Sequence, residues 1–270
     1  NCKYFVVSSF CMKSQLSIVE KRAISSSNLQ NRINLNKKLG SKDLTEWLFQ
    51  RYKVKKNDVI LELGCGVGNH VIKQSKIVKK KGLIFAIDYS NKSLNTLKKN
   101  LNTNNIKTKC ISMDDVPKYL KNKNIYFDKI ISSYALYYAK NPIKVITECS
   151  KFLKPNGVFL ITAPCYPHTL TEFASKEKTL PKIAKKYIDF STKKLEPFLR
   201  KNKIKNQTFN FQNKLKFKHL EDLTNFYKST IFYNKKSQNN LINFYRKEKL
   251  KSSFFKIIKS AKLYKFSIKN

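Results

Sequence analysis

The chain has 270 residues, of which 41% are hydrophobic and 13% aromatic, so a packed α/β domain is expected and wholesale disorder is not. No uncharged apolar run approaches the about 20 residues of a membrane-spanning helix, and we expect no transmembrane segment. The longest apolar candidates, Tyr4–Met12 and Ile130–Ala139, are both shorter. The chain begins with Asn1, whereas Met12 opens a more natural start. Two interpretations of residues 1–11 stay open, upstream read-through and the edge of a fragment, and we leave them out of the expected fold.

The net charge is strongly positive, because 56 Lys and Arg residues face 17 Asp and Glu residues, a balance of +39. Such an excess is typical of proteins that bind nucleic acid or another anionic surface. However, 51 of the 56 basic residues are Lys, and Arg is the better bidentate reader of phosphates and bases. We therefore favour a solvated lysine surface shaped by AT-rich codons, with a functional polyanion site and membrane-surface binding as alternatives.

The six cysteines are scattered, without a C-x-x-C pair and without a Cys/His cluster at zinc-ligand spacing. This usage is typical of reduced, mostly buried thiols, so we expect a cytoplasmic protein and no metal site.

From Asp58 onward, short apolar runs alternate with amphipathic helices. Ser90 caps one helix, Asn141 and Pro142 begin another, and Lys154–Gly157 breaks it. The alternation predicts βαβ units in a doubly wound parallel sheet. The expected strands are Val59–Leu63, Leu83–Asp88, Thr108–Ser112, Phe127–Ser133 and Val158–Thr162.

Beyond Ala163 the pattern is looser, and no Gly/Ser linker separates this part from the core. The expected helices are Thr179–Lys201 with a candidate break at Pro197, His219–Lys228 and Gln238–Lys249. Thr208–Phe211 alternates like a strand, and Phe254–Ile268 is expected to be a long strand or a hairpin.

The sharpest motif, Glu62–Gly68, reads Glu-Leu-Gly-Cys-Gly-Val-Gly where the first strand meets the first helix. Glycines there permit a tight turn and close approach of a ligand, and the helix N-terminus offers free N–H groups. A nicotinamide-dinucleotide loop would read G-x-G-x-x-G, but Asn69 occupies its last position, and no G-K-[ST] follows for a triphosphate. The loop holds three of only six glycines, which indicates a ligand-binding turn.

Scarce acidic residues recur at the strand ends: Glu62 in the last turn of the first strand, Asp88 at the end of the second, and Asp114 with Asp115 after the third. Ligands of open α/β sheets bind at the carboxyl ends of the strands. Each acid by itself could be a helix cap, but together they outline a nucleoside pocket.

These motifs resemble the class I S-adenosylmethionine-dependent methyltransferases, in particular the branch of quinone and small-molecule methyltransferases. The resemblance covers residues 30–165 and rests on E-x-G-x-G-x-G, Ile87-Asp88, Met113-Asp114 and the Leu-Lys-Pro-Asn-Gly turn at 153–157. Asn156 stands where the family has glycine, and because Asn tolerates positive φ the turn is expected to persist. The segment 132–138 is similar to the family's segment after the fourth strand, with tyrosines in place of paired histidines.

The resemblance implies a doubly wound, mostly parallel, seven-stranded Rossmann-like sheet with helices on both faces and a C-terminal helical lid. The implied organisation is an N-terminal helical segment at 1–57, a cofactor-binding core at 58–165, and lid helices with the last strands of the same domain at 166–270.

The resemblance also implies S-adenosyl-L-methionine as cofactor and assigns its contacts. The loop residues would cradle the methionine portion, Asp88 the ribose, and Met113 with Asp114 the adenine. Arg32 is similar to a segment that closes over the cofactor in some relatives, with a solvated helix face as the alternative. The implied cofactor-binding residues are Glu62, Gly64, Gly66, Gly68, Asp88, Tyr89, Met113, Asp114 and Ser133.

The acceptor side is less defined. His168 follows the fifth strand and is the candidate base or orienting group, with a surface loop residue as the alternative. Tyr134, Tyr137 and Tyr166 are candidate acceptor-binding walls, with core packing as the alternative. The sequence lacks the N-P-P-[YF] mark of adenine-amino methyltransferases, and Pro164-Cys165 follows the wrong strand for a cytosine nucleophile. We therefore expect methyl transfer by in-line displacement to a small organic or lipid-like acceptor. An rRNA or tRNA methyltransferase that uses the lysine surface, and a cofactor-binding protein without turnover, are the alternatives.

Overall fold

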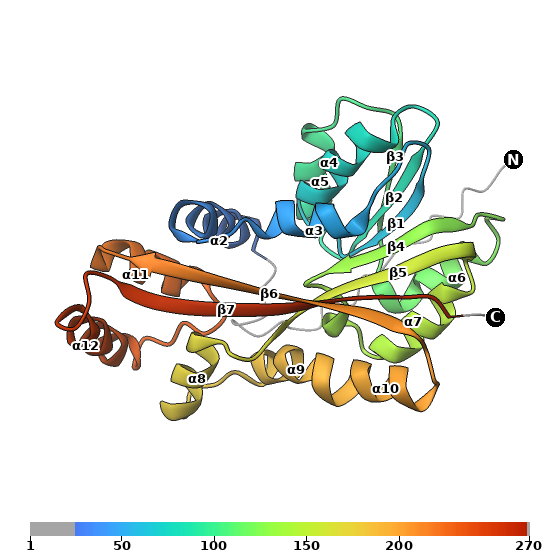
Figure 1. Ribbon diagram of the computed structural model, residues 1–270. Helices are drawn as coiled ribbons and strands as arrows, with labels where there is room; N and C mark the ends of the chain where they lie inside the picture. The colour runs from blue at the N-terminus through green and yellow to red at the C-terminus, as the bar shows by residue number, and fades with distance from the viewer. Residues whose placement is uncertain (1–24, 269–270) are drawn as a thin grey trace, which may run out of the picture.

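Seven strands form one sheet in the computed structural model, which describes residues 25–268 (Figure 1). They are β1 (Val59–Leu63), β2 (Leu83–Asp88), β3 (Ile106–Cys110), β4 (Phe127–Ser133), β5 (Leu153–Cys165), β6 (Asn206–Phe217) and β7 (Phe255–Phe266). Their order across the sheet is β3-β2-β1-β4-β5-β7-β6. Strands β1 to β5 are parallel, and β7 runs antiparallel to both of its neighbours. The expected mostly parallel, seven-stranded Rossmann-like sheet is confirmed. Residues 1–11 lie outside the described residues.

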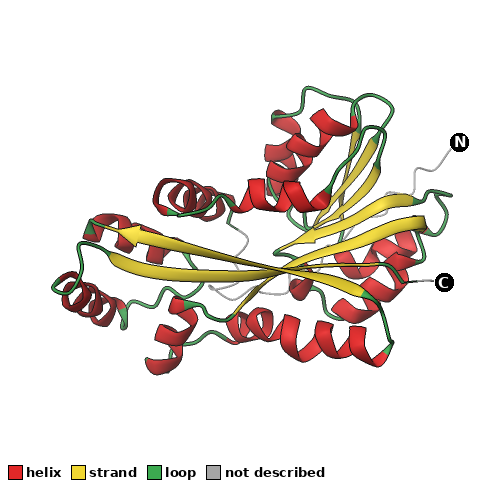
Figure 2. Ribbon diagram, in the orientation of Figure 1, coloured by secondary structure: helices red, strands yellow, loops and turns green. Residues whose placement is uncertain are grey.

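Helices cover both faces of this sheet (Figure 2). They are α2 (Ser26–Leu39), α3 (Leu44–Tyr52), α4 (Asn69–Val78), α5 (Asn91–Lys99), α6 (Val116–Leu120), α7 (Pro142–Ser150), α8 (Thr169–Lys176), α9 (Lys182–Phe190), α10 (Glu196–Lys201), α11 (Leu220–Ser229) and α12 (Gln238–Lys249). Side chains alternate along the strands between two apolar cores: Ile60 and Ile84 pack with α3, α4 and α5, whereas Leu61 and Phe85 pack with α6, α7 and α9. Within residues 25–268, none of these helices combines the length and apolarity needed to cross a bilayer.

Several expected boundaries are confirmed, namely the strands β1, β2 and β4 and the helix α12. Ser90 caps α5, because its hydroxyl accepts the Ser93 N–H at 3.2 Å. Asn141 caps α7 by accepting the Lys144 N–H at 3.1 Å, and Pro142 is the first residue of that helix. Local capping signals therefore position the helices that follow β2 and β4.

The third and fifth strands differ from expectation. Strand β3 begins at Ile106, which pairs with Ile84, and ends before Ser112, which caps the 3₁₀ turn η1 (Met113–Asp115). Helix α7 ends at Ser150, and residues 154–157 form an irregular part of β5 rather than a helix-ending turn. Since Phe127 pairs with Leu153 and Lys129 with Val158, the extra residues of β5 are accommodated as a bulge.

The C-terminal part is more regular than its sequence pattern indicates. The expected helix 179–201 is α9, a π-helical turn η3 (Ser191–Leu195) and α10, with Pro197 in the first turn of α10, where no N–H is needed. Strand β6 is longer than Thr208–Phe211, and β7 is one strand because it pairs with β6 over its whole length. Figure 1 shows this long strand pair reaching past the parallel strands toward α11 and α12.

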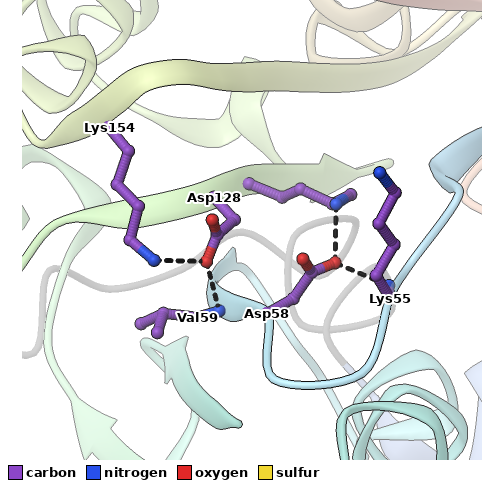
Figure 3. Close-up of polar contacts among 6 residues, drawn as sticks. Lys55, Asp58, Val59, Asp128 and Lys154 are labelled. Atoms are coloured by element: carbon purple, nitrogen blue, oxygen red, sulfur yellow. Dashed lines mark hydrogen bonds and ion pairs between the residues drawn. The ribbon is translucent and has the colours of Figure 1, made fainter.

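Two acids at the amino ends of the strands are structural (Figure 3). Asp58 accepts a hydrogen bond from Lys129 Nζ at 2.6 Å, and the two side chains are 8% and 9% exposed. Asp128 accepts hydrogen bonds from Lys154 Nζ and from the Val59 N–H, both at 2.7 Å. Burial disfavours a carboxylate here, but these bonds outweigh it and hold the pKa of Asp128 below its ordinary value. The network ties β1 to β4 and β5 at the edge opposite the strands' carboxyl ends.

Candidate active site

A cavity of about 2040 Å³ lies at the carboxyl ends of the parallel strands. One side is lined by the glycine loop and by the acids at the carboxyl ends of β1, β2 and β3. The other side is lined by residues of α9, α11, β7 and the segment after β5, and α2 borders both sides because its Leu29 lies beside Gly66. Pockets for a single drug-sized ligand usually measure about 300–1,000 Å³, so this cavity has room for two ligands side by side.

The three loop glycines, Gly64, Gly66 and Gly68, all have positive φ, at +76°, +55° and +87°. A Cβ atom at Gly64 would lie 2.2 Å from Ala135 Cβ, and one at Gly68 would lie 2.2 Å from Leu97 Cδ1. Among residues 25–268, a Cβ atom at Gly66 would meet only Leu29 Cδ2, at 3.7 Å. A side chain at Gly64 or Gly68 would therefore clash with neighbouring side chains, whereas Gly66 faces open space in the cavity. That open side suits a ligand that approaches the backbone closely.

Asp88 is joined to this loop. Its carboxylate accepts the Gly66 N–H at 2.7 Å and the Ser90 N–H at 2.8 Å. Burial raises the pKa of Asp88 above its ordinary value, and the backbone hydrogen bonds offset only part of that effect. Tyr89 follows on the cavity wall, half exposed.

Glu62 is a buried acid that has no Lys or Arg partner among residues 25–268. It is 2% exposed, accepts a hydrogen bond from Gln74 Nε2 at 2.8 Å and lies 3.9 Å from His70 Nδ1. Burial raises the pKa of Glu62 to about 8 and lowers that of His70 to about 4. A buried carboxyl group beside a neutral imidazole, at the wall of a cavity, favours a cationic ligand, and a sulfonium cofactor with an amino group has that charge.

Met113, Asp114 and Ser133 also line the cavity. Asp114 accepts the backbone N–H groups of Lys140 and Asn141, both at 3.0 Å, so it also joins η1 to the start of α7. Partial burial opposes its charge, but these bonds hold the pKa of Asp114 below its ordinary value.

The structure brings most of the expected residues into one cavity, but two of them lie elsewhere. Gly68 does not line the cavity and instead packs on Leu97 at the start of α4. Tyr166 is 53% exposed and lies outside the lining, in the bend that follows β5. The expected residues on the lining are Glu62, Gly64, Gly66, Asp88, Tyr89, Met113, Asp114, Ser133, Tyr134, Tyr137 and His168.

His168 is 6% exposed, and its Nδ1 lies 3.1 Å from Thr171 Oγ1. Burial, with a smaller effect of Lys259, lowers the pKa of His168 to about 3. The imidazole is therefore neutral at physiological pH and a weak base. Its role toward the acceptor stays a prediction.

The sequence did not single out several residues on the acceptor half. Tyr187 and Ile183 come from α9, and Lys259 comes from β7. Arg32 also lines the cavity, a position that the alternative interpretation, a solvated helix face, does not predict. A helical spacing of apolar residues indicates that Tyr187 lies on a buried face. Lys259 is one of 51 lysines, and no local sequence pattern distinguishes it from the others.

The chain matches a known protein family over most of its length. A family model described as a methyltransferase domain matches residues 54–241. The chain belongs to this methyltransferase domain family. The family recognised in the sequence is thereby confirmed, and so is S-adenosyl-L-methionine as its cofactor.

The curated relatives of this methyltransferase domain differ in their acceptors. It is 26% identical over 179 residues to a tRNA U34 carboxymethyltransferase of Campylobacter fetus, covering 63% of this chain and 62% of that protein. It is 26% identical over 140 residues to a demethylmenaquinone methyltransferase of Lactobacillus johnsonii, covering 51% and 57%. The chain thus spans less than two thirds of the length of either relative.

Solved structures share the fold. A Bacillus halodurans protein superposes with a TM-score of 0.59 at 14% identity, over 83% of this chain and 98% of that one. A SAM dependent methyltransferase of Aquifex aeolicus superposes with a TM-score of 0.52 at 13% identity, over 90% and 98%. At these identities the likeness concerns the fold alone.

Proposed function

We propose that this protein transfers the methyl group of S-adenosyl-L-methionine to a small organic or lipid-like acceptor in the aromatic half of the cavity. One observation carries the proposal: the chain beyond Ala163 walls the cavity with apolar and aromatic side chains, rather than leaving a broad basic groove beside the glycine loop. Those side chains are Leu170, Ile183, Tyr187, Phe226, Ile231 and Phe232.

The cofactor, when bound, supplies a methyl group that its sulfonium already activates. The chain's part is to bind and orient. The open side of Gly66 and the Asp88 carboxylate suit the cofactor. Burial keeps Glu62 protonated in the free protein, and the cationic part of the bound cofactor would favour its ionised form. Tyr187 and Phe232, with ring centroids 6.4 Å apart, give the acceptor flat apolar walls that exclude water.

A proton has to leave when the acceptor is a hydroxyl or a carbon acid. His168 stays the candidate for holding or orienting that group, since it lines the acceptor half and Thr171 fixes its ring. Its low pKa favours orientation by a neutral imidazole over proton storage.

The proposal has three further parts. The C-terminal helices act as a lid, the chain divides into three parts at residues 57 and 165, and the protein is cytoplasmic. All four of Phe173, Phe226, Tyr227 and Phe232 belong to the core, and of these Phe226 and Phe232 also line the cavity, so only some aromatics of 163–250 suit a lid. Hydrogen exchange there should slow further when acceptor joins the demethylated cofactor.

The alternative acceptor is RNA, favoured by the tRNA-modifying relative and by the net charge of +39. Methyl-labelled cofactor, incubated with the protein and with either tRNA or a metabolite extract, separates the two. Label in the low-mass fraction supports the proposal. Label in tRNA, or submicromolar RNA binding at physiological salt with a steep salt dependence, contradicts it.

A further inference from the structure

Two cations from distant parts of the chain meet in the acceptor half of the cavity. Arg32 of α2 and Lys259 of β7 both line it. Arg32 Nη1 donates to the carbonyl of Ser229, the last residue of α11. Lys259 Nζ donates to Asn36 Oδ1 at 3.2 Å and lies 5.7 Å from the centroid of the Phe226 ring. Both cations therefore stand against the C-terminal end of α11.

Neither cation has an acidic partner within residues 25–268, where no carboxylate oxygen lies within 4.0 Å of either one. Other lysines, such as Lys38, Lys129 and Lys262, do have such partners. Burial lowers the pKa of Arg32, and burial together with the charge of Arg32 lowers that of Lys259 to about 8. Two like charges are thus held half-buried with no carboxylate beside either of them, an arrangement that costs stability.

Both side chains also keep unused donors. A guanidinium has five N–H donors and an ammonium three, and each cation spends only one on the hydrogen bonds above. The bond to the end of α11 uses one N–H group of Arg32. Lys259 does not cap this helix, because it donates to a side-chain amide rather than to a helix carbonyl.

The lining differs in charge from one part to another. Glu62, Asp88 and Asp114 lie at the strand ends, where Lys73 and Lys140 also line the cavity. Arg32, Lys186 and Lys259 come from α2, α9 and β7, and no acidic residue of these three elements is on the lining. An anionic ligand is therefore stabilised beside the aromatic walls.

We infer that the methyl acceptor is a small aromatic carboxylate, whose carboxylate binds Arg32 and Lys259 while its ring packs against Tyr187, Phe226 and Phe232. The planar guanidinium fork matches a carboxylate, and the ammonium adds a point charge beside it. This inference rests on the proposed function and names the acceptor class for the same cavity.

Calorimetry on the protein saturated with S-adenosylhomocysteine tests it with matched acid and amide probes. The pairs are para-hydroxybenzoate with para-hydroxybenzamide and naphthoate with naphthamide, which differ in charge but little in shape. We expect each acid to bind at least about tenfold more tightly than its amide. That preference should vanish in Arg32→Gln and in Lys259→Gln. It should persist in the control Lys256→Gln, which alters an exposed lysine on the same strand.

Equal affinity of acid and amide, a preference unchanged in both variants, or no binding of any acid would overturn the inference. Arg32→Gln removes a contact to α11, so thermal unfolding is recorded for each variant, and Lys259→Gln stands as the variant that removes no helix cap. The readout is binding, not turnover. Label transferred to tRNA would defeat the proposed function, whereas labelled small products with no acid preference would defeat only this inference.

Discussion

The Asp88 carboxylate accepts the backbone N–H of Gly66 at 2.7 Å, so the acid at the end of β2 supports the one loop glycine that faces open space in the cavity. The glycine motif and the strand-end acid are thus one unit. A change at either residue is expected to act on the same ligand.

Replacing Asp88 with alanine should weaken binding of S-adenosylhomocysteine by about tenfold to a hundredfold. Charge-assisted hydrogen bonds to a ligand contribute about 1.5–3 kcal/mol, and the variant also loses the support of Gly66. Calorimetry measures the dissociation constant, with Asp189→Ala as control because Asp189 pairs with Lys193 outside the cavity. An unchanged constant for Asp88→Ala would mean that this carboxylate does not meet the ligand.

Substitutions at two loop glycines should have different effects. Gly66→Val should abolish cofactor binding, because its side chain extends into open space in the cavity, and it should also cost stability, because a φ of +55° strains a β-branched residue. Gly68→Ala should lower the free energy of unfolding by about 1–3 kcal/mol, because its Cβ meets Leu97, which is fully buried. Calorimetry and urea unfolding on both variants check this. Normal binding by folded Gly66→Val would contradict the site.

Glu62 should make stability depend on pH in a defined direction. Its pKa is about 8 in the folded protein against an ordinary 4.5, so the folded state keeps a proton that the unfolded state releases. The resulting stabilisation is complete below pH 4.5 and is lost as pH rises toward about 8. Urea unfolding across that range should show a larger decline for the wild type than for Glu62→Gln. Parallel profiles would mean that Glu62 titrates normally.

The ion pair at the opposite edge should affect stability without affecting ligand binding. Asp58→Ala leaves Lys129 buried and unpaired, and breaking such a pair costs about 3–5 kcal/mol. Denaturant unfolding measures the loss, while the folded variant should bind S-adenosylhomocysteine as the wild type does. Weaker binding by the folded variant would mean that the two edges of the sheet are coupled.

The parts of this protein that follow local rules could be predicted from its sequence. Strand β1 is a short, almost wholly apolar run ahead of a glycine loop, and Ser90 and Asn141 cap their helices through their own side chains. The cofactor half of the cavity follows from the same rules, because parallel strands bring Glu62 and Asp88 to one edge.

The acceptor half could not be predicted in the same way. Lys259 reaches the cavity because β7 lies between β5 and β6 in the sheet. These strands are far apart in the sequence, and no local pattern specifies that they pair. Arg32 and Tyr187 arrive there on separate helices. Tyr166 follows β5 directly in the sequence, but it lies in the bend after the strand and is exposed.

A crystal structure with S-adenosylhomocysteine tests the cofactor site most directly. We expect the ligand to lie between the glycine loop and Asp88, with its ribose hydroxyls against the Asp88 carboxylate and with open cavity remaining toward Tyr187 and Phe232. A ligand bound elsewhere on the protein, or bound here with Asp88 turned away from it, would contradict this site.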